Sequence, residues 1–289
     1  MSDDAAFEHI NEAKVDMDHI YDQLDPRCYF RELNKLDYAI PDTAKPIFQD
    51  LIGHLKTHND DPLHVLDLGC SYGVNAAILK YDLSMDDLYE HWGHGQMAGA
   101  TPEEVVESDQ RYFSDIDNPD DIVMIGLDQS ENAISYATEA GLLDEGIVAN
   151  LEDETLRSTE KDILGQVDLV ISTGCVGYLT EKSFERFMPA VSKGRPPWVA
   201  NFVLRLFPFD SIEESLNSCG YVTEKLEGRT FFQRQFASRG EREDVLDKLR
   251  EHGVDPVGKE SNGHFLAEFY LSRPAADVAE MPMEQLFSA

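Results

Sequence analysis

Positive charge is scarce in this 289-residue sequence. It holds 24 Lys and Arg residues against 56 Asp and Glu residues, a formal net charge of −32 at pH 7. Proteins that bind nucleic-acid backbones or anionic membranes present basic surfaces, so this charge disfavours both kinds of partner. Hydrophobic residues still make up 42% of the chain, which is enough for a packed core. We therefore expect a folded, acidic protein with no nucleic-acid or membrane partner.

Long apolar runs and metal-binding patterns are missing as well. No segment approaches the roughly 20 apolar residues that a membrane-spanning helix needs, and the first residues are acidic rather than signal-like. The four cysteines form no Cys-x-x-Cys pair, and His91 and His94 have no evident third ligand nearby. These features predict a cytoplasmic protein that binds no metal.

The most informative stretch of the chain is residues 65–73, with the sequence VLDLGCSYG. An apolar run ends at Asp67, Gly69 and Gly73 bracket a tight turn, and a helical run starts at Val74. The N-terminus of such a helix attracts negative charge and hydrogen-bond acceptors. The pattern therefore predicts a strand, a cofactor-binding loop and a helix.

The spacing in this loop separates two kinds of cofactor. It lacks the Gly-x-Gly-x-x-Gly pattern of dinucleotide sites, and Asp67 would repel a pyrophosphate. The spacing Asp-x-Gly-x-x-x-Gly resembles motif I of the class I S-adenosylmethionine (SAM) dependent methyltransferases, which usually have Gly where Ser71 stands. The resemblance covers roughly residues 46–205 and implies that SAM is bound by Asp67, Gly69, Cys70, Ser71 and Gly73.

Strands alternate with helices along the rest of the chain. This order predicts an α/β fold, a doubly wound and mostly parallel Rossmann-like sheet with its ligand crevice at the carboxyl ends of the strands. The expected strands are 63–68, 122–128, 146–149, 167–172, 196–203 and 264–272, and the region 228–236 is a candidate for a further strand.

Polar residues end the next strands of the expected sheet. Asp128 has the oxygen pair that can hold two ribose hydroxyls, and the resemblance places an adenine contact at Asn150 and the floor of the cofactor at Thr173. We expect the cofactor to contact Asp128, Gln129, Asn150, Leu151, Thr173 and Gly174.

Three parts are expected in the chain. Residues 1–45 form a helical leader that acts as a lid, residues 46–273 form the SAM-binding domain with a helical insertion at 81–120, and residues 274–289 form a tail. Thr101 and Pro102 are expected to cap and start a helix of the insertion.

The acceptor site is expected where small-molecule methyltransferases build it, from the leader, insertions and late strands. Candidate substrate-binding residues are Tyr21, Tyr29, Tyr38 and Arg205, and candidate catalytic residues are Tyr178 and His264. Helix packing is an equally open role for the tyrosines, and a surface or salt-bridge role for Arg205.

These features predict a SAM-dependent methyltransferase that acts on a small-molecule acceptor by in-line displacement. A homodimer stays open. Two alternatives also stay open: a SAM-binding sensor or partner protein without catalysis, and an NAD-dependent oxidoreductase, whose phosphate loop would tolerate Asp67 poorly.

Overall fold

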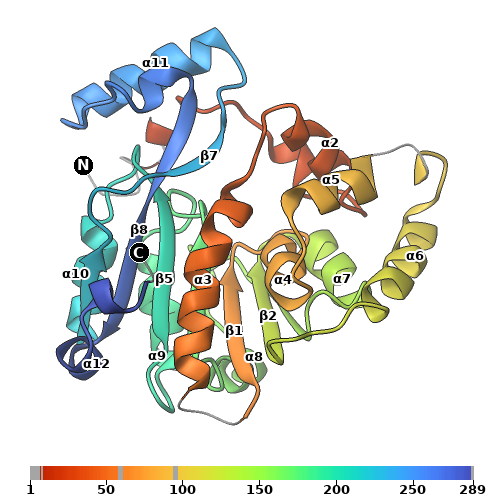
Figure 1. Cartoon of the computed structure of the whole chain (residues 1–289), viewed down its shortest axis with the longest axis horizontal. Coiled ribbons are helices and arrows are strands. Elements are labelled where there is room, and N and C mark those ends of the chain that lie inside the picture. Colours follow the sequence, from red (N-terminus) through yellow and green to blue (C-terminus); the bar gives the residue numbers. More distant parts are fainter. Residues whose placement is uncertain (1–6, 8, 58–60, 94–96, 288–289) are drawn as a thin grey trace.

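An eight-stranded sheet forms the centre of a computed structural model that describes residues 7, 9–57, 61–93 and 97–287 (Figure 1). The strand order is β3-β2-β1-β4-β5-β8-β6, and β7 also pairs with β8. Strands β1 to β5 are parallel to their neighbours in this group, whereas β8 is antiparallel to β5, β6 and β7. The predicted doubly wound, mostly parallel sheet is confirmed.

The strands lie close to where the hydrophobic pattern predicts them. Strands β1 and β2 are almost continuously buried, because helices cover both faces of a parallel sheet. The exception is β6, whose polar, partly exposed residues give no strand pattern. The strands are β1 Leu63–Leu68, β2 Ile122–Asp128, β3 Glu145–Val148, β4 Leu169–Thr173, β5 Trp198–Leu204, β6 Tyr221–Lys225, β7 Phe231–Gln235 and β8 His264–Pro274.

Two hydrophobic cores lie on the two faces of the sheet. Adjacent residues of β1 alternate between them, with Val65 in one core and Leu66 in the other. One face is covered by α3 Ile40–Lys56, α4 Val74–Lys80 and α7 Glu131–Glu139. The other is covered by α8 Ser158–Leu164, α9 Glu181–Val191 and α10 Asp210–Ser218.

The leader and the insertion pack against each other beside the sheet (Figure 1). Phe30 stacks on Trp92 with ring centroids 4.4 Å apart. The predicted cap of the second insertion helix is confirmed, because Thr101 and Glu104 form a reciprocal capping box with Pro in the first turn. These segments contain η1 Asp18–Ile20, α2 Arg27–Asn34, α5 Met85–Gly93 and α6 Pro102–Ser114.

The helix before β1 is longer than the sequence suggests. It begins at Ile40 rather than near 46, because Pro41 stands in the first turn, where its missing N–H has no intrahelical partner to lose. Pro46 lies inside this helix, where one backbone hydrogen bond cannot form.

The C-terminal part supports the antiparallel end of the sheet. Met283 and Leu286 are buried in the core that α3 also joins, so this segment packs onto the domain. Its elements are α11 Arg239–Glu251, η3 Glu260–Asn262, α12 Ala275–Glu280 and η4 Met283–Gln285. No helix among the described residues has the length and hydrophobicity to cross a membrane.

Candidate active site

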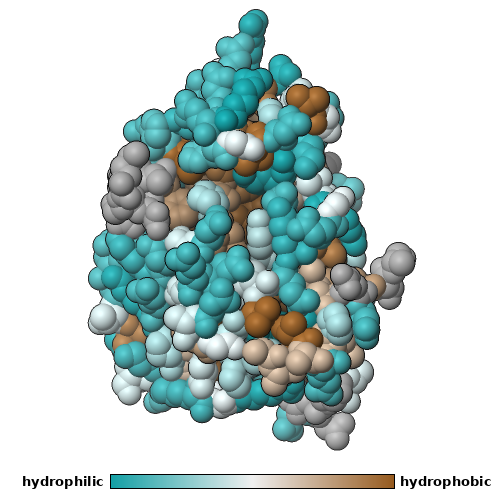
Figure 2. Space-filling model, turned by 90° about the vertical axis from the view of Figure 1, so that its left-hand side faces the viewer, coloured by the Kyte–Doolittle hydropathy of each residue, from teal (hydrophilic) through white to brown (hydrophobic). Residues whose placement is uncertain are grey.

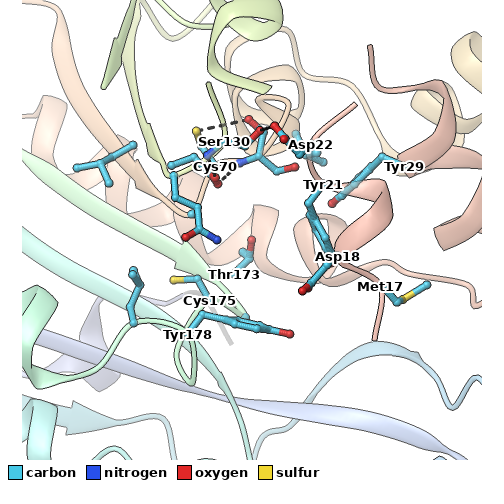
Figure 3. Close-up of a pocket in the computed structure, with 18 of the residues that line it drawn as sticks. Met17, Asp18, Tyr21, Asp22, Tyr29, Cys70, Ser130, Thr173, Cys175 and Tyr178 are labelled. Carbon is cyan, nitrogen blue, oxygen red and sulfur yellow. Dashed lines mark hydrogen bonds between the residues drawn. The ribbon is translucent and has the colours of Figure 1, made fainter. Parts of the chain in front are cut away.

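The carboxyl ends of β1 to β4 meet at a cavity of about 910 Å³. Strands β1 and β4 are neighbours in the sheet although their connections leave in opposite directions, and this switch point is where open α/β sheets bind ligands. The leader forms the opposite wall of the cavity (Figure 3). In Figure 2, one face of the molecule shows a hollow in its upper half with hydrophobic residues in it.

The loop after β1 depends on backbone conformations that favour glycine. Gly69, Ser71 and Gly73 have φ of +69°, +49° and +77°. The left-handed φ of Ser71 explains in physical terms why the resembling family usually has Gly at this position. The Gly69 and Cys70 N–H groups donate to the carbonyl of Leu127, which fixes the loop on β2.

Asp67 lies beneath this loop and is fully buried. Its Oδ1 accepts a hydrogen bond of 3.0 Å from Asn75, whose amide also donates to Thr173 Oγ1 at 3.0 Å. Its Oδ2 and the hydroxyl of Ser71 are buried without a hydrogen-bond partner among the described residues. Burial raises the pKa of Asp67 to about 7, against the opposing hydrogen bond from Asn75. A cation bound above the loop would favour the ionised carboxylate.

Asp128 ties the first two strand ends together. Its carboxylate accepts hydrogen bonds from the N–H of Ser71 at 2.9 Å and of Ser130 at 3.0 Å. Burial raises the pKa of Asp128, and these N–H groups oppose that shift. Each oxygen can accept a further hydrogen bond, and Asp128 lines the cavity, as binding of a pair of hydroxyls requires.

The third and fourth strand ends complete this side of the cavity. Asn150 and Leu151 line it after β3, and Thr173 and Gly174 line it after β4. Gly174 has φ of +80°, and a Cβ there would lie 2.5 Å from Nε2 of Gln233 on β7. The strand order thus brings together the loop ends that the sequence predicts as cofactor contacts, except that Asp67 and Gly73 lie behind the lining.

The leader is held over the cavity by polar contacts. The Tyr72 hydroxyl accepts from the N–H of Gln23 at 2.7 Å. Ser130 donates to Asp22 at 2.7 Å, as the dashed lines near these residues in Figure 3 indicate. The N–H of Val15 donates to Glu241 at 2.9 Å. These contacts place Tyr21, Tyr29 and Tyr38 in the cavity wall.

The three leader tyrosines form a connected aromatic wall. Tyr29 makes edge-on contacts with Tyr21 and Tyr38, with ring centroids 5.6 Å and 6.3 Å apart. Burial raises the pKa of Tyr38 to about 12, so its hydroxyl stays neutral at physiological pH. Tyr178, which follows β4, faces the same space from the other side, next to Tyr21 and Asp18 in Figure 3.

Two predicted site residues lie elsewhere. Arg205 is buried outside the cavity lining, and its guanidinium pairs with Glu260 at 2.6 Å and Glu268 at 3.3 Å. The structure therefore gives Arg205 the salt-bridge role that the sequence left open. His264 begins β8, contacts Phe232 edge-on and is also absent from the cavity lining.

Two basic residues of the cavity wall carry no signal in the sequence. Lys14 lies in the polar leader, and Arg234 lies on β7 with its guanidinium bound by Glu241 at 2.6 Å. Only the fold brings these distant segments together.

The insertion histidines do not form a metal site in the part of the chain that the structure describes. His91 bonds to the buried Asp109 at 2.7 Å, which also accepts from Trp92 and Tyr136. His94 lies outside the described residues. No group of three potential metal ligands gathers anywhere in residues 9–57, 61–93 and 97–287.

No protein-family model and no curated protein matches this chain, whereas many solved structures do. The plantazolicin methyltransferase BamL, in complex with a triazolic desmethylPZN analog and SAH, is 15% identical, with 93% of this chain and 97% of that chain covered and a TM-score of 0.47. A TehB-like SAM-dependent methyltransferase from Corynebacterium glutamicum is 15% identical, with 76% and 85% covered and a TM-score of 0.36.

A third similar structure is magnesium protoporphyrin IX methyltransferase from Synechocystis PCC 6803 with bound SAM. It is 10% identical, with 93% of this chain and 91% of that chain covered and a TM-score of 0.36. At these identities the likeness concerns the fold alone.

Proposed function

We propose that this chain is a SAM-dependent methyltransferase that transfers a methyl group to a small-molecule acceptor in the cavity at the carboxyl ends of β1 to β4. One observation carries the proposal. The cavity joins the glycine-containing loop after β1, the carboxylate of Asp128 after β2, and the polar ends of β3 and β4. These are the groups that a nucleoside with a cationic amino-acid tail would need.

The residues present fit SAM in two ways. The ammonium and sulfonium of SAM are cations, and the unpartnered Oδ2 of Asp67 provides a negative counterpart beneath the loop. Left-handed Gly69 and Gly174 let the loops pack closely around the cavity, since a Cβ would lie 2.7 Å from the Cβ of Cys175 or 2.5 Å from Nε2 of Gln233. Asp128 would hold the ribose hydroxyls, and Asn150 the adenine edge.

SAM supplies an already activated methyl group, so the protein mainly has to orient the acceptor and exclude water. The position of the leader supports both roles. Its tyrosines cover the cavity, and its contacts with Tyr72, Ser130 and Glu241 fix it over the cofactor loop. The formal net charge of −32 favours a small acceptor over a nucleic acid.

Asp128→Ala is expected to weaken SAM binding by about 1–3 kcal/mol, because two charge-assisted hydrogen bonds to ribose are lost. This loss corresponds to roughly 5-fold to 150-fold in Kd, which isothermal titration calorimetry would resolve. The matched control is Asp162→Ala, which removes an exposed carboxylate on α8 that lies 3.7 Å from Lys193. Equal SAM affinity in wild type and Asp128→Ala would refute the ribose assignment.

The leader is expected to exchange its amide hydrogens more slowly when SAM and acceptor bind, because the ligands fill the cavity that it covers. Hydrogen exchange measured by mass spectrometry should show added protection over residues 18–40. The internal control is α8, residues 158–164, which covers the face of the sheet opposite α3, α4 and α7. Unchanged exchange over 18–40 in the presence of both ligands would count against a lid.

Turnover separates this proposal from a SAM-binding protein without catalysis. SAM labelled in its methyl group, incubated with the protein and a metabolite extract, is expected to yield a labelled small molecule. The same incubation with Asp128→Ala at equal SAM concentration should yield less. Tight SAM binding with no labelled product from any extract would favour the non-catalytic alternative.

A further inference from the structure

Lys14 occupies an unusual position in the cavity wall. It comes from the leader and is half-buried, and its Nζ lies 3.1 Å from the hydroxyl of Tyr178. The same Nζ lies 4.4 Å from the centroid of the Tyr178 ring and 5.4 Å from that of Phe207. Among the described residues, no carboxylate pairs with it within 4.0 Å, although the chain has more than twice as many acids as bases.

We propose that Lys14 is the general base of the methyl transfer, and that the acceptor is an aromatic compound whose attacking atom is a ring hydroxyl. The proposal rests on the proposed methyltransferase function and deepens it. Lys14 lines the cavity beside Tyr178, in the same lining as the leader tyrosines. Tyr178 is then a positioning residue, because its hydroxyl accepts the hydrogen bond that aims the amine.

The charges around Lys14 favour a neutral amine. Burial and, to a smaller extent, the nearby charge of Arg234 lower the pKa of Lys14 to about 7. Glu241 and Asp18 oppose this shift, but Glu241 is already bound to Arg234 by two hydrogen bonds of 2.6 Å and 3.1 Å. Asp18 is part of the cavity lining and forms no ion pair with Lys14. A general base whose conjugate acid has a pKa near 7 can accept a proton efficiently at physiological pH.

The aromatic walls define the acceptor class. Tyr21 and Tyr178 face the same space from two sides (Figure 3), and Tyr38 also lines the cavity, so several aromatic side chains are available to pack against a flat ring. A hydroxyl on an aromatic ring keeps its proton at neutral pH, so a neighbouring amine must take that proton as the oxygen attacks the methyl carbon. A thiol or carboxylate acceptor would gain much less from a base, because it ionises more readily by itself.

The step balances without any further reactant. The acceptor O–H gives its proton to Nζ of Lys14, and the oxygen electron pair forms the new bond to the methyl carbon. The bond between that carbon and the sulfur of SAM breaks, its electron pair stays on sulfur, and S-adenosylhomocysteine leaves. Lys14 then returns its proton to solvent through the cavity mouth.

The test combines kinetics with a direct titration of the amine. Wild type, Lys14→Met, Lys14→Arg and the control Lys35→Met, which changes an exposed lysine of the leader, are assayed with labelled SAM and a panel of simple phenols and aliphatic amines. For wild type the turnover number at saturating SAM should rise with pH through about 7, because the neutral amine is the active form. Methyl transfer should go to phenols.

Both Lys14 substitutions are expected to lower the turnover number by about 10²-fold to 10⁴-fold and to remove the rise with pH, since neither side chain accepts a proton. The SAM Kd should stay within about twofold of wild type, while Tyr178→Phe should lower turnover less and shift the midpoint of the profile. A Lys14→Met enzyme with the wild-type rate and pH profile would overturn the proposal.

Nuclear magnetic resonance of protein labelled at the lysine ε-carbons supplies a readout that needs no acceptor. The resonance that disappears in Lys14→Met should titrate near pH 7, and a midpoint near pH 10 would overturn the assignment of the base. Failure of the proposed function is detected separately, as absence of SAM binding by wild type. Transfer to amines but not to phenols would overturn the acceptor class.

Discussion

Gly69→Ala is expected to lower the free energy of unfolding by about 2–5 kcal/mol and to weaken SAM binding by more than tenfold. Gly69 has φ of +69°, and a left-handed conformation costs a residue with a side chain about 1–2 kcal/mol. Its new Cβ would also lie 2.7 Å from the Cβ of Cys175, and such overpacking costs about 1–3 kcal/mol. Relief requires the loop after β1 to move, which displaces the Cys70 and Ser71 backbone from the cavity.

The matched control for Gly69→Ala is Gly253→Ala. Gly253 follows the C-terminal end of α11 with φ of +74°, and no described atom outside its own neighbours lies within 4 Å of an added Cβ. This control carries the backbone strain without the clash, so it should cost about 1–2 kcal/mol and leave SAM affinity unchanged. Urea unfolding and calorimetry measure the two effects. Equal SAM affinity in Gly69→Ala and Gly253→Ala would show that the loop does not contact the cofactor.

Arg205→Met is expected to lower the free energy of unfolding by about 3–5 kcal/mol. The guanidinium of Arg205 is 5% exposed and holds the buried carboxylate of Glu260, which is 2% exposed. Removing one partner of a buried pair leaves an uncompensated charge, which is the costly case. Because Arg205 lies outside the cavity lining, SAM affinity and the acceptor KM of the folded protein should not change.

Two comparisons isolate the buried pair. Lys225→Met removes the half-exposed lysine that also binds Glu268, at 2.7 Å, and should cost less than about 1 kcal/mol. The double variant Arg205→Met with Glu260→Leu should be more stable than Arg205→Met alone, since it removes the unpaired carboxylate. A raised acceptor KM in Arg205→Met with unchanged stability would show that Arg205 binds substrate and has no structural role.

The sheet could be predicted from the sequence because its strongest signals are local. Apart from His64, strands β1 and β2 are apolar up to Asp67 and Asp128, so both the strands and the cofactor side of the site could be predicted. Glycine in the loop after β1 marks a left-handed backbone conformation, and such a glycine is visible in a single sequence. The capping box at Thr101 is local for the same reason.

The acceptor side could not be predicted because tertiary structure creates it. Lys14 and Arg234 are 220 residues apart and meet only when β7 pairs with β8 and the leader folds over the sheet. Arg205 shows the opposite effect. Its place after β5 suggested an active-site cation, but the carboxylates that bind it come from η3 and β8, far along the chain.

The central claim is that the cavity at the ends of β1 to β4 binds SAM. Isothermal titration calorimetry of the purified wild-type protein with SAM and, separately, with NAD tests it most directly. We expect saturable SAM binding with one site per chain and no saturable binding of NAD, because Asp67 and the loop spacing disfavour a pyrophosphate. Saturable NAD binding without SAM binding would contradict the account.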